Sequence, residues 1–299
     1  MDSRTGIALK LVATLAFTVM SACVRGLEGE IPIGQVIFFR SLIVLIPLSI
    51  WFVMSEQSIR VPARKNLRSL IAASFAGLGG LFFGFLALAY LPLVNVTVLS
   101  YTAPLFTIIL AATLLGEQVR IYRWSAVMIG FLGVFITVLP DLVALRLDHS
   151  STALETVSLI GTAMALAAAF CAALSAISVR RLNRLEPSSS IVLIYTLTGI
   201  GAGLTSIAFG WKMPDGQELL LLIGCGLAGG IGQITMTLSL RHAEASLLAP
   251  FDYTTMIWAL ILGYAFMNEA PATATIGGAL VVIAAGLFAM CREIGKRAE

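Results

Sequence analysis

Leu99 to Glu117, LSYTAPLFTIILAATLLGE, is repeated in part 152 residues later by Phe251 to Glu269, FDYTTMIWALILGYAFMNE. Both stretches place Tyr-Thr third and fourth, Ile-Leu eleventh and twelfth, and Glu nineteenth. Apolar segments match each other easily by chance, so five identities in 19 residues are weak by themselves. The repetition decides the fold only if the rest of the sequence supports it.

Composition places the chain in a lipid bilayer. Of its 299 residues, 59% are hydrophobic and only 12% are charged, and the mean hydropathy is +0.96. A soluble domain is nearer half apolar and a quarter charged. We therefore expect an all-α integral membrane protein. The four cysteines are far apart and form no CxxC pair, so neither a disulfide framework nor a metal site is expected.

Ten segments are long and apolar enough to be membrane spans, each of which needs about 20 such residues. They cover residues 5–24, 35–54, 68–90, 94–116, 122–139, 157–179, 190–210, 217–240, 245–267 and 273–291. Some connections are very short, such as residues 91–93 and 241–244. Helices joined by such short links must run antiparallel.

Lysine and arginine residues indicate the orientation, because they are enriched on the cytoplasmic side. With the N-terminus inside, fifteen of them fall in cytoplasmic segments and three in outer segments, while Arg40 lies within a span. This imbalance predicts that both termini are cytoplasmic. It also favours an even number of spans.

Ten spans divided into two equal copies give five spans each, and an odd number inserts the second copy upside down. We expect residues 1–150 and 151–299 to form two inverted five-helix repeats. Glu117 then falls at the cytoplasmic end of its span and Glu269 at the outer end of its own. Inverted repeats are typical of secondary transporters, in which the halves rock about a site near the bilayer midplane.

The repeated stretches also resemble a known family. A helix rich in small residues, a short turn, Pro104 and a terminal Gly116-Glu117 are similar to the EamA-type repeat of the drug/metabolite transporter superfamily. Arg40, within FFRSL, resembles that family as well. In the second copy Glu269 matches, but Met256 replaces the proline and Asn268 the glycine. The resemblance implies ten helices, a central cavity, and export of small metabolites from a bacterial cytoplasm across the inner membrane.

Charged residues within spans are costly, so each needs a role. Lys10 either extends its ammonium group to the cytoplasmic surface or binds a carboxylate or gates the cavity. Arg40 is interpreted as structural, bonding backbone carbonyls or helix ends. Glu117 and Glu269 are expected to fix helix ends, with a role as a coupling carboxylate as the alternative. Asp252 is a candidate to help close an inner gate.

Aromatic and polar side chains gather in four of the spans, and hydroxyl groups facing lipid would lack partners. They predict a lumen in which rings stack on a flat apolar or aromatic solute, although ordinary helix packing remains open for any single residue. The candidate cavity residues are Lys10, Phe82, Phe83, Tyr101, Thr102, Phe106, Gln233, Met236, Thr237, Tyr253 and Trp258.

These features favour a secondary exporter of small organic solutes, with aromatic or large neutral amino acids first among them. No span carries a central Asp or Glu, so facilitated export and proton antiport both remain open. The expected partners are a small-molecule substrate and the bilayer, with no nucleic acid, cofactor or metal. The oligomeric state is left open and is compatible with a monomer.

A multidrug or nucleotide-sugar carrier of the same superfamily is the alternative. A multidrug carrier should have a carboxylate-rich pocket, and a nucleotide-sugar carrier several cavity-facing cations, of which only Lys10 and Arg40 qualify. An intramembrane enzyme is a remote third possibility, since the chain has no HExxH, GxSxG or paired aspartates. The GxGxxG at residues 224–229 lies inside a span without a preceding strand, which argues against nucleotide binding.

Overall fold

Long apolar helices dominate the computed structural model, which describes residues 3–55, 64–114, 121–147, 153–182, 185–242 and 248–295. No β-strand occurs in these ranges. The elements are α1 (Ser3–Gly26), α2 (Ile33–Ser55), α3 (Arg64–Tyr90), α4 (Leu93–Ser100), α5 (Ala103–Leu114), α6 (Ile121–Leu147), α7 (Ala153–Leu182), α8 (Ser188–Thr205), η1 (Ser206–Phe209), α9 (Gly216–His242), η2 (Ala249–Tyr253), α11 (Thr254–Met267) and α12 (Thr273–Gly295).

The helices have the length and hydropathy of membrane spans. Within the described residues, seven are long and apolar enough to cross a membrane. Three shorter apolar helices, Met128–Leu139, Phe251–Met267 and Thr273–Ala284, fall where the other spans are predicted. The prediction of an all-helical membrane protein is therefore confirmed for this part of the chain. The number of ten spans agrees with these elements and remains a prediction.

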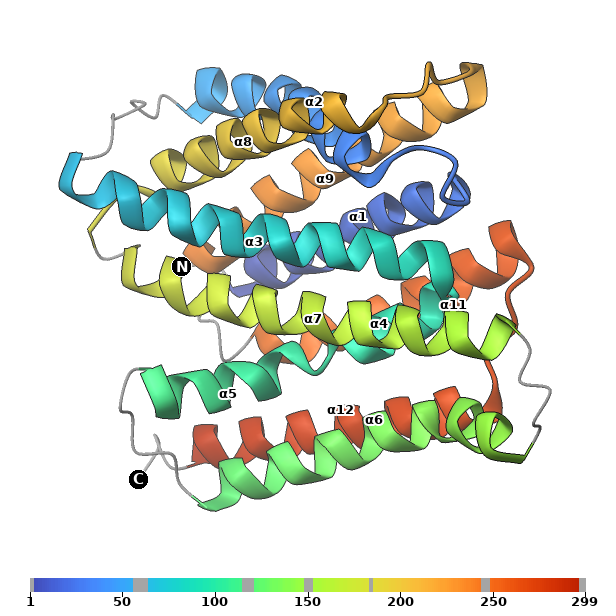
Figure 1. Ribbon diagram of the computed structural model, residues 1–299. Helices are drawn as coiled ribbons and strands as arrows, with labels where there is room; N and C mark the ends of the chain where they lie inside the picture. The colour runs from blue at the N-terminus through green and yellow to red at the C-terminus, as the bar shows by residue number, and fades with distance from the viewer. Residues whose placement is uncertain are drawn as a thin grey trace.

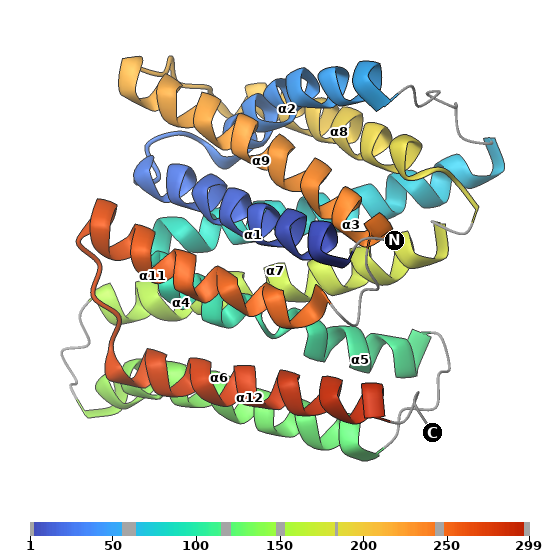
Figure 2. The same ribbon diagram turned by 180° about the vertical axis from the view of Figure 1, so that it is seen from behind.

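The helices lie side by side in layers (Figures 1 and 2). One outer layer contains α2 and α8, and the opposite one contains α6 and α12; α1, α3, α4, α5, α7, α9 and α11 lie between them. The first residues of α1 and the last residues of α12 are at the same end of the bundle, which we call the terminal end. The opposite end, where α1 finishes, is called the distal end.

Two close helix pairs join the first half of the chain to the second. α3 packs along α7, and α1 packs along α9. Adding 152 to the residue numbers of α1 gives α7, and adding it to those of α3 gives α9. The α1–α9 pair and the α3–α7 pair are therefore equivalent contacts of the two repeated halves. α1 and α7 run in opposite directions (Figure 1). Small residues permit the close approach, since a Cβ on Gly80 would lie 3.3 Å from the Ala172 backbone nitrogen.

α6 and α12 are in even closer contact at a pair of glycines. A Cβ on Gly278 would collide with the Thr137 hydroxyl and the Gly133 carbonyl oxygen, whereas a Cβ on the adjacent Gly277 would meet nothing within 4 Å. We expect Gly278→Ala to cost about 1–3 kcal/mol of stability through overpacking. Thermal unfolding in detergent should show a lower midpoint for Gly278→Ala only. Equal midpoints for Gly278→Ala and the Gly277→Ala control would contradict this packing.

A polar cluster joins two loops at the distal end. Lys212 donates hydrogen bonds to Glu218 at 2.9 Å and to Glu30 at 3.1 Å, and its backbone exchanges two hydrogen bonds with the Gln35 amide. The hydrogen bond to Glu218, followed by that to Glu30, raises the pKa of Lys212. The ion pairs are solvent-exposed, so we assign them a role in loop positioning and little stability.

Candidate functional site

The fourth predicted span, 94–116, is broken in the middle. α4 ends at Ser100 and α5 begins at Ala103, with Tyr101 and Thr102 forming a turn between them. Pro104 explains the break, because it has no N–H for the helical bond to Ser100 and its ring would clash with that carbonyl. Instead, the Tyr101 and Thr102 amides donate to carbonyls three residues earlier, as in a 3-10 turn. The Thr102 hydroxyl also donates to the Leu99 carbonyl, at 2.7 Å. The predicted span is still present as one apolar segment, Leu93–Leu114, with this break inside it.

The corresponding stretch of the second half is also irregular. Residues Ala249–Tyr253 form the 3-10 helix η2, and the α-helix starts only at Thr254. Pro250 occupies the first turn of η2, where the missing N–H of proline costs no helical hydrogen bond. The replacement of the matching proline by Met256 therefore does not remove the irregularity.

The two irregular segments meet each other. Tyr101 and Tyr253, which are equivalent under the 152-residue offset, contact edge to face with their ring centroids 5.3 Å apart. The Tyr101 hydroxyl donates to the Tyr253 backbone carbonyl at 3.3 Å. Tyr101 is buried, as is Met256 one turn along α11. The two tyrosines, which the repeat makes equivalent, are thus also in direct contact across the two halves.

Lys10 and Asp252 form an ion pair between the first and second halves of the chain. The Lys10 Nζ lies 2.6 Å from Asp252 Oδ1 and 3.2 Å from Met236 Sδ. Lys10 is 2% exposed, whereas the Asp252 side chain is 53% exposed. Lys10 therefore does not extend to the surface by itself. Its charge is matched inside the protein by a carboxylate that remains accessible.

A polar stripe on α1 continues from this ion pair. The Thr14 and Thr254 hydroxyls are 3.0 Å apart, and the Thr18 hydroxyl donates to the Thr14 carbonyl at 2.8 Å. Lys10, Thr14 and Thr18 are spaced by four residues, so they share one face of α1. All three are buried. This face attaches α1 to η2 and α11, and sequence reasoning missed Thr14 because a lone threonine in a span gives no separate signal.

A second ion pair lies at the distal end. Arg25 Nε donates to Glu269 Oε1 at 2.8 Å, while Glu269 Oε2 accepts the Leu93 backbone N–H at 2.8 Å. Arg25 also donates to the Leu88 carbonyl at 3.1 Å. Glu269 thus caps the start of α4 and holds the end of α1 at the same time. We call this set the distal latch.

Asn268 directs Glu269 into the distal latch. It has φ 52°, in the left-handed region, and the Glu269 amide donates to the Gly263 carbonyl at 3.0 Å. Asparagine tolerates this conformation better than other non-glycine residues do. The replacement of glycine by Asn268 therefore preserves the helix end. The equivalent Glu117 lies outside the described residues.

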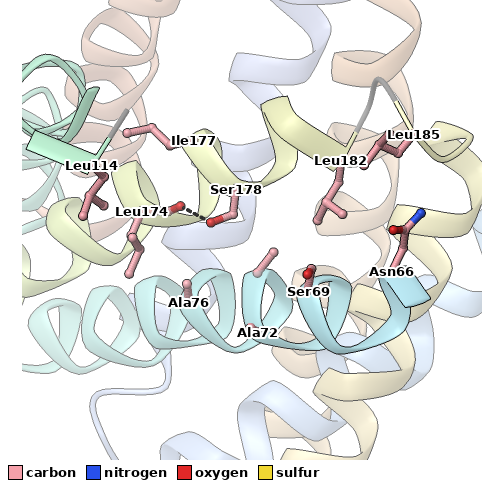
Figure 3. A pocket seen from close by; sticks show the side chains of 11 residues that line it. Asn66, Ser69, Ala72, Ala76, Leu114, Leu174, Ile177, Ser178, Leu182 and Leu185 are labelled. Atoms are coloured by element: carbon pink, nitrogen blue, oxygen red, sulfur yellow. Dashed lines mark hydrogen bonds between the residues drawn. The ribbon is translucent and has the colours of Figure 1, made fainter. Parts of the chain in front are cut away.

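A cavity of about 440 Å³ is present between α3, α5 and α7 toward the terminal end (Figure 3). Its walls are mostly alanine and leucine, with polar groups from Asn66, Ser69 and Ser178. Ile177 lines this cavity and is the residue that the offset of 152 pairs with Arg25. The terminal end therefore has an apolar cavity at Ile177, whereas the distal end has the charged latch at the equivalent residue, Arg25.

The other predicted cavity residues lie at several places. Phe82 and Phe83 contact each other on α3, but Phe82 is 40% exposed. Phe106 packs edge to face with Phe131 and Phe170, away from the tyrosine pair.

On α9, Gln233 and Thr237 are half-buried on either side of Met236, and Thr237 donates to the Gln233 carbonyl. Trp258, on α11, has a buried Nε1 without a hydrogen-bond partner in the described part of the chain. The structure thus brings together Lys10, Met236, Asp252, Tyr101 and Tyr253.

Arg40 is buried as well, with 3% of its surface exposed. Its guanidinium lies over the Tyr195 ring, 5.8 Å from the centroid. The expected bonds to backbone carbonyls are not seen at Nε, which has no hydrogen-bond partner among the described residues. Sequence reasoning did not identify Tyr195, because its contact with Arg40 joins α2 to α8.

Comparison with known proteins gives a family match over nearly the whole chain. The EamA-like transporter family matches residues 4–139 and again residues 159–291. The pseudopaline exporter CntI of Pseudomonas aeruginosa (strain UCBPP-PA14) is 27% identical over 286 residues, which are 94% of each chain. The S-adenosylmethionine uptake transporter of Rickettsia bellii (strain RML369-C) is 28% identical, covering 95% of this chain and 92% of the relative. A solved crystal structure shares the fold, with a TM-score of 0.67, 19% identity and full coverage of both chains.

Proposed function

The chain belongs to the EamA-like transporter family, and from that premise we propose that it exports small organic metabolites, with aromatic or large neutral amino acids first among them. It is a multi-span integral membrane protein, and its relatives are transporters, not enzymes. The proposal adds the direction, the substrate class and an alternating-access mechanism. Its relatives' names include both an exporter and an uptake transporter, so family membership does not decide the direction.

The meeting of two interrupted helices is the observation that carries this proposal. Transporters commonly build their substrate sites from discontinuous helices near the midplane, where the repeats face each other. Here the interruptions at Tyr101 and at η2 come from the two halves and are in contact. Aromatic rings, hydroxyl groups and the Lys10–Asp252 ion pair surround that contact. Such a site suits a zwitterion with an apolar or aromatic side chain.

The difference between the two ends supports alternating access. The distal latch joins α1, α4 and α11 at one end, while the cavity between α3, α5 and α7 lies toward the other. We assign the terminal end to the cytoplasm from the distribution of lysine and arginine residues. The two halves are then inverted repeats in a bacterial inner membrane, with the cavity on the cytoplasmic side and the Lys10–Asp252 pair closed at that same end.

In this mechanism Lys10 acts as a gate residue. Asp252 already neutralises the Lys10 ammonium group, so Lys10 is less suited to bind a substrate carboxylate. It is better suited to close the contact between α1 and η2. Asp252 is half exposed and can exchange this partner for water when the halves move apart. Closing and reopening of the pair would accompany each transport cycle.

Transport by the purified protein in proteoliposomes tests the proposal. We expect efflux of radiolabelled phenylalanine down its own gradient, inhibited by aromatic and large neutral amino acids at least tenfold more strongly than by nucleotide sugars or cationic drugs. An inactive protein or a drug-dominated inhibition profile would overturn it. An absolute requirement for a pH gradient would replace facilitated export by proton antiport.

A further inference from the structure

Among the residues that the structure describes, Arg40 is a buried cation without a carboxylate partner. It is 3% exposed, and it makes no ion pair with a carboxylate of the described residues. It is the eighth residue of α2, which places it about 10 Å from the distal start of that helix. A charge at this depth is expensive and is normally compensated.

Lys10 shows the contrast. It is equally buried, but its ammonium lies 2.6 Å from Asp252. Of the two buried cations that the sequence analysis singled out, one is therefore neutralised and the other is not. A negatively charged ligand would find its electrostatic attraction at Arg40.

The surroundings of Arg40 hold the guanidinium in place without compensating its charge. The Tyr195 ring supports it from α8 at 5.8 Å. A Cβ on Gly229 would lie 3.2 Å from Arg40 Nε, so the glycine of α9 leaves the space that the guanidinium occupies. A desolvated cation–π contact contributes about 2 kcal/mol or more, which is still less than the several kcal/mol that burying a charge costs. The site is thus built for an arginine and still lacks an anion.

We propose that Arg40, supported by Tyr195, binds the carboxylate group of the transported substrate. Arginine suits this role because its fork of N–H donors matches the two oxygens of a carboxylate. The Nε donor without a partner is a donor that such a ligand can satisfy. This inference rests on the proposed function, and it names the group of the substrate that is recognised.

Binding of two isosteric probes to the purified full-length protein tests the assignment. Phenylacetate carries the carboxylate and phenylacetamide replaces it with a neutral amide, and thermal shift in detergent at constant ionic strength measures both. Wild type should bind phenylacetate about tenfold more tightly than the amide, as expected for a charge-assisted pair. Arg40→Gln should abolish that preference, and Arg40→Lys should reduce it severalfold by keeping the charge without the fork.

The control is Arg68→Gln, which removes an exposed cation from α3 and should leave the preference unchanged. A wild-type protein that binds both probes equally would overturn the proposal, even if Arg40→Gln failed to fold. So would a full preference retained in Arg40→Gln. These measurements need no transport, so a protein that failed to export amino acids but showed an Arg40-dependent preference would refute only the proposed function.

Discussion

Asp252→Asn is expected to reduce transport about a hundredfold. The substitution leaves the Lys10 ammonium buried without a counter-charge, and breaking a fully buried pair in this way costs about 3–5 kcal/mol. Asp252 is half exposed, so we expect the lower value of about 3 kcal/mol. That free energy lowers the population of the conformation in which Lys10 is buried by about a hundredfold. Initial rates in proteoliposomes, normalised to the amount of inserted protein, measure the effect.

Two further variants separate charge from folding. Lys10→Met combined with Asp252→Asn removes both charges and should restore thermal stability to near wild type, while transport stays low because the gate is absent. Glu28→Gln removes an exposed carboxylate at the distal end and should leave both properties unchanged. A transport rate within twofold of wild type in Asp252→Asn would exclude the ion pair from the mechanism.

Glu269→Ala is expected to open the distal end. It removes the ion pair with Arg25 and the cap on the Leu93 amide, and charge-assisted hydrogen bonds of this kind contribute about 1.5–3 kcal/mol. A loss of about 2 kcal/mol changes the balance between distally closed and distally open forms by about thirtyfold. Val94, 1% exposed on α4 next to this latch, provides a reporter when replaced by cysteine in a variant without the native cysteines.

A membrane-impermeant maleimide added outside intact cells should label Val94→Cys at least tenfold faster with Glu269→Ala than with Glu269. Glu269→Gln is the matched variant, since its amide oxygen can still accept the Leu93 N–H but carries no charge. An intermediate rate is expected for it. Unchanged labelling in Glu269→Ala would show that the latch does not hold the distal end closed. Faster labelling only from the cytoplasmic side would show that the proposed orientation in the membrane is wrong.

Much of the helix pattern could be predicted from hydropathy alone. Helices such as α2 and α9 begin and end within a few residues of their predicted spans because burial in lipid demands continuous apolar runs. The interruption at Tyr101 could not be located in this way, because Ser100, Tyr101 and Thr102 are too few polar residues to divide an apolar segment of about 20 residues. The repeated Tyr-Thr pair lies at the interruption in both halves, although it was interpreted only as a sign of internal repetition.

The pairing of charges was beyond sequence reasoning. Lys10 and Asp252 were both candidates for gating, but 242 positions separate them and only the packing of α1 against η2 shows their contact. Arg25 was counted only as an outer charge, although it holds Glu269. Hydropathy and charge counts locate a residue along the membrane normal, and they do not say which helix it faces.

Ile177, where the first half has Arg25, gives the molecule unequal ends. If the terminal end is cytoplasmic, the Arg25–Glu269 pair closes the outer side and the Lys10–Asp252 pair closes the inner side, and neither pair is repeated at the equivalent position of the other end. Such a carrier has to break a different ion pair to open each side of the membrane.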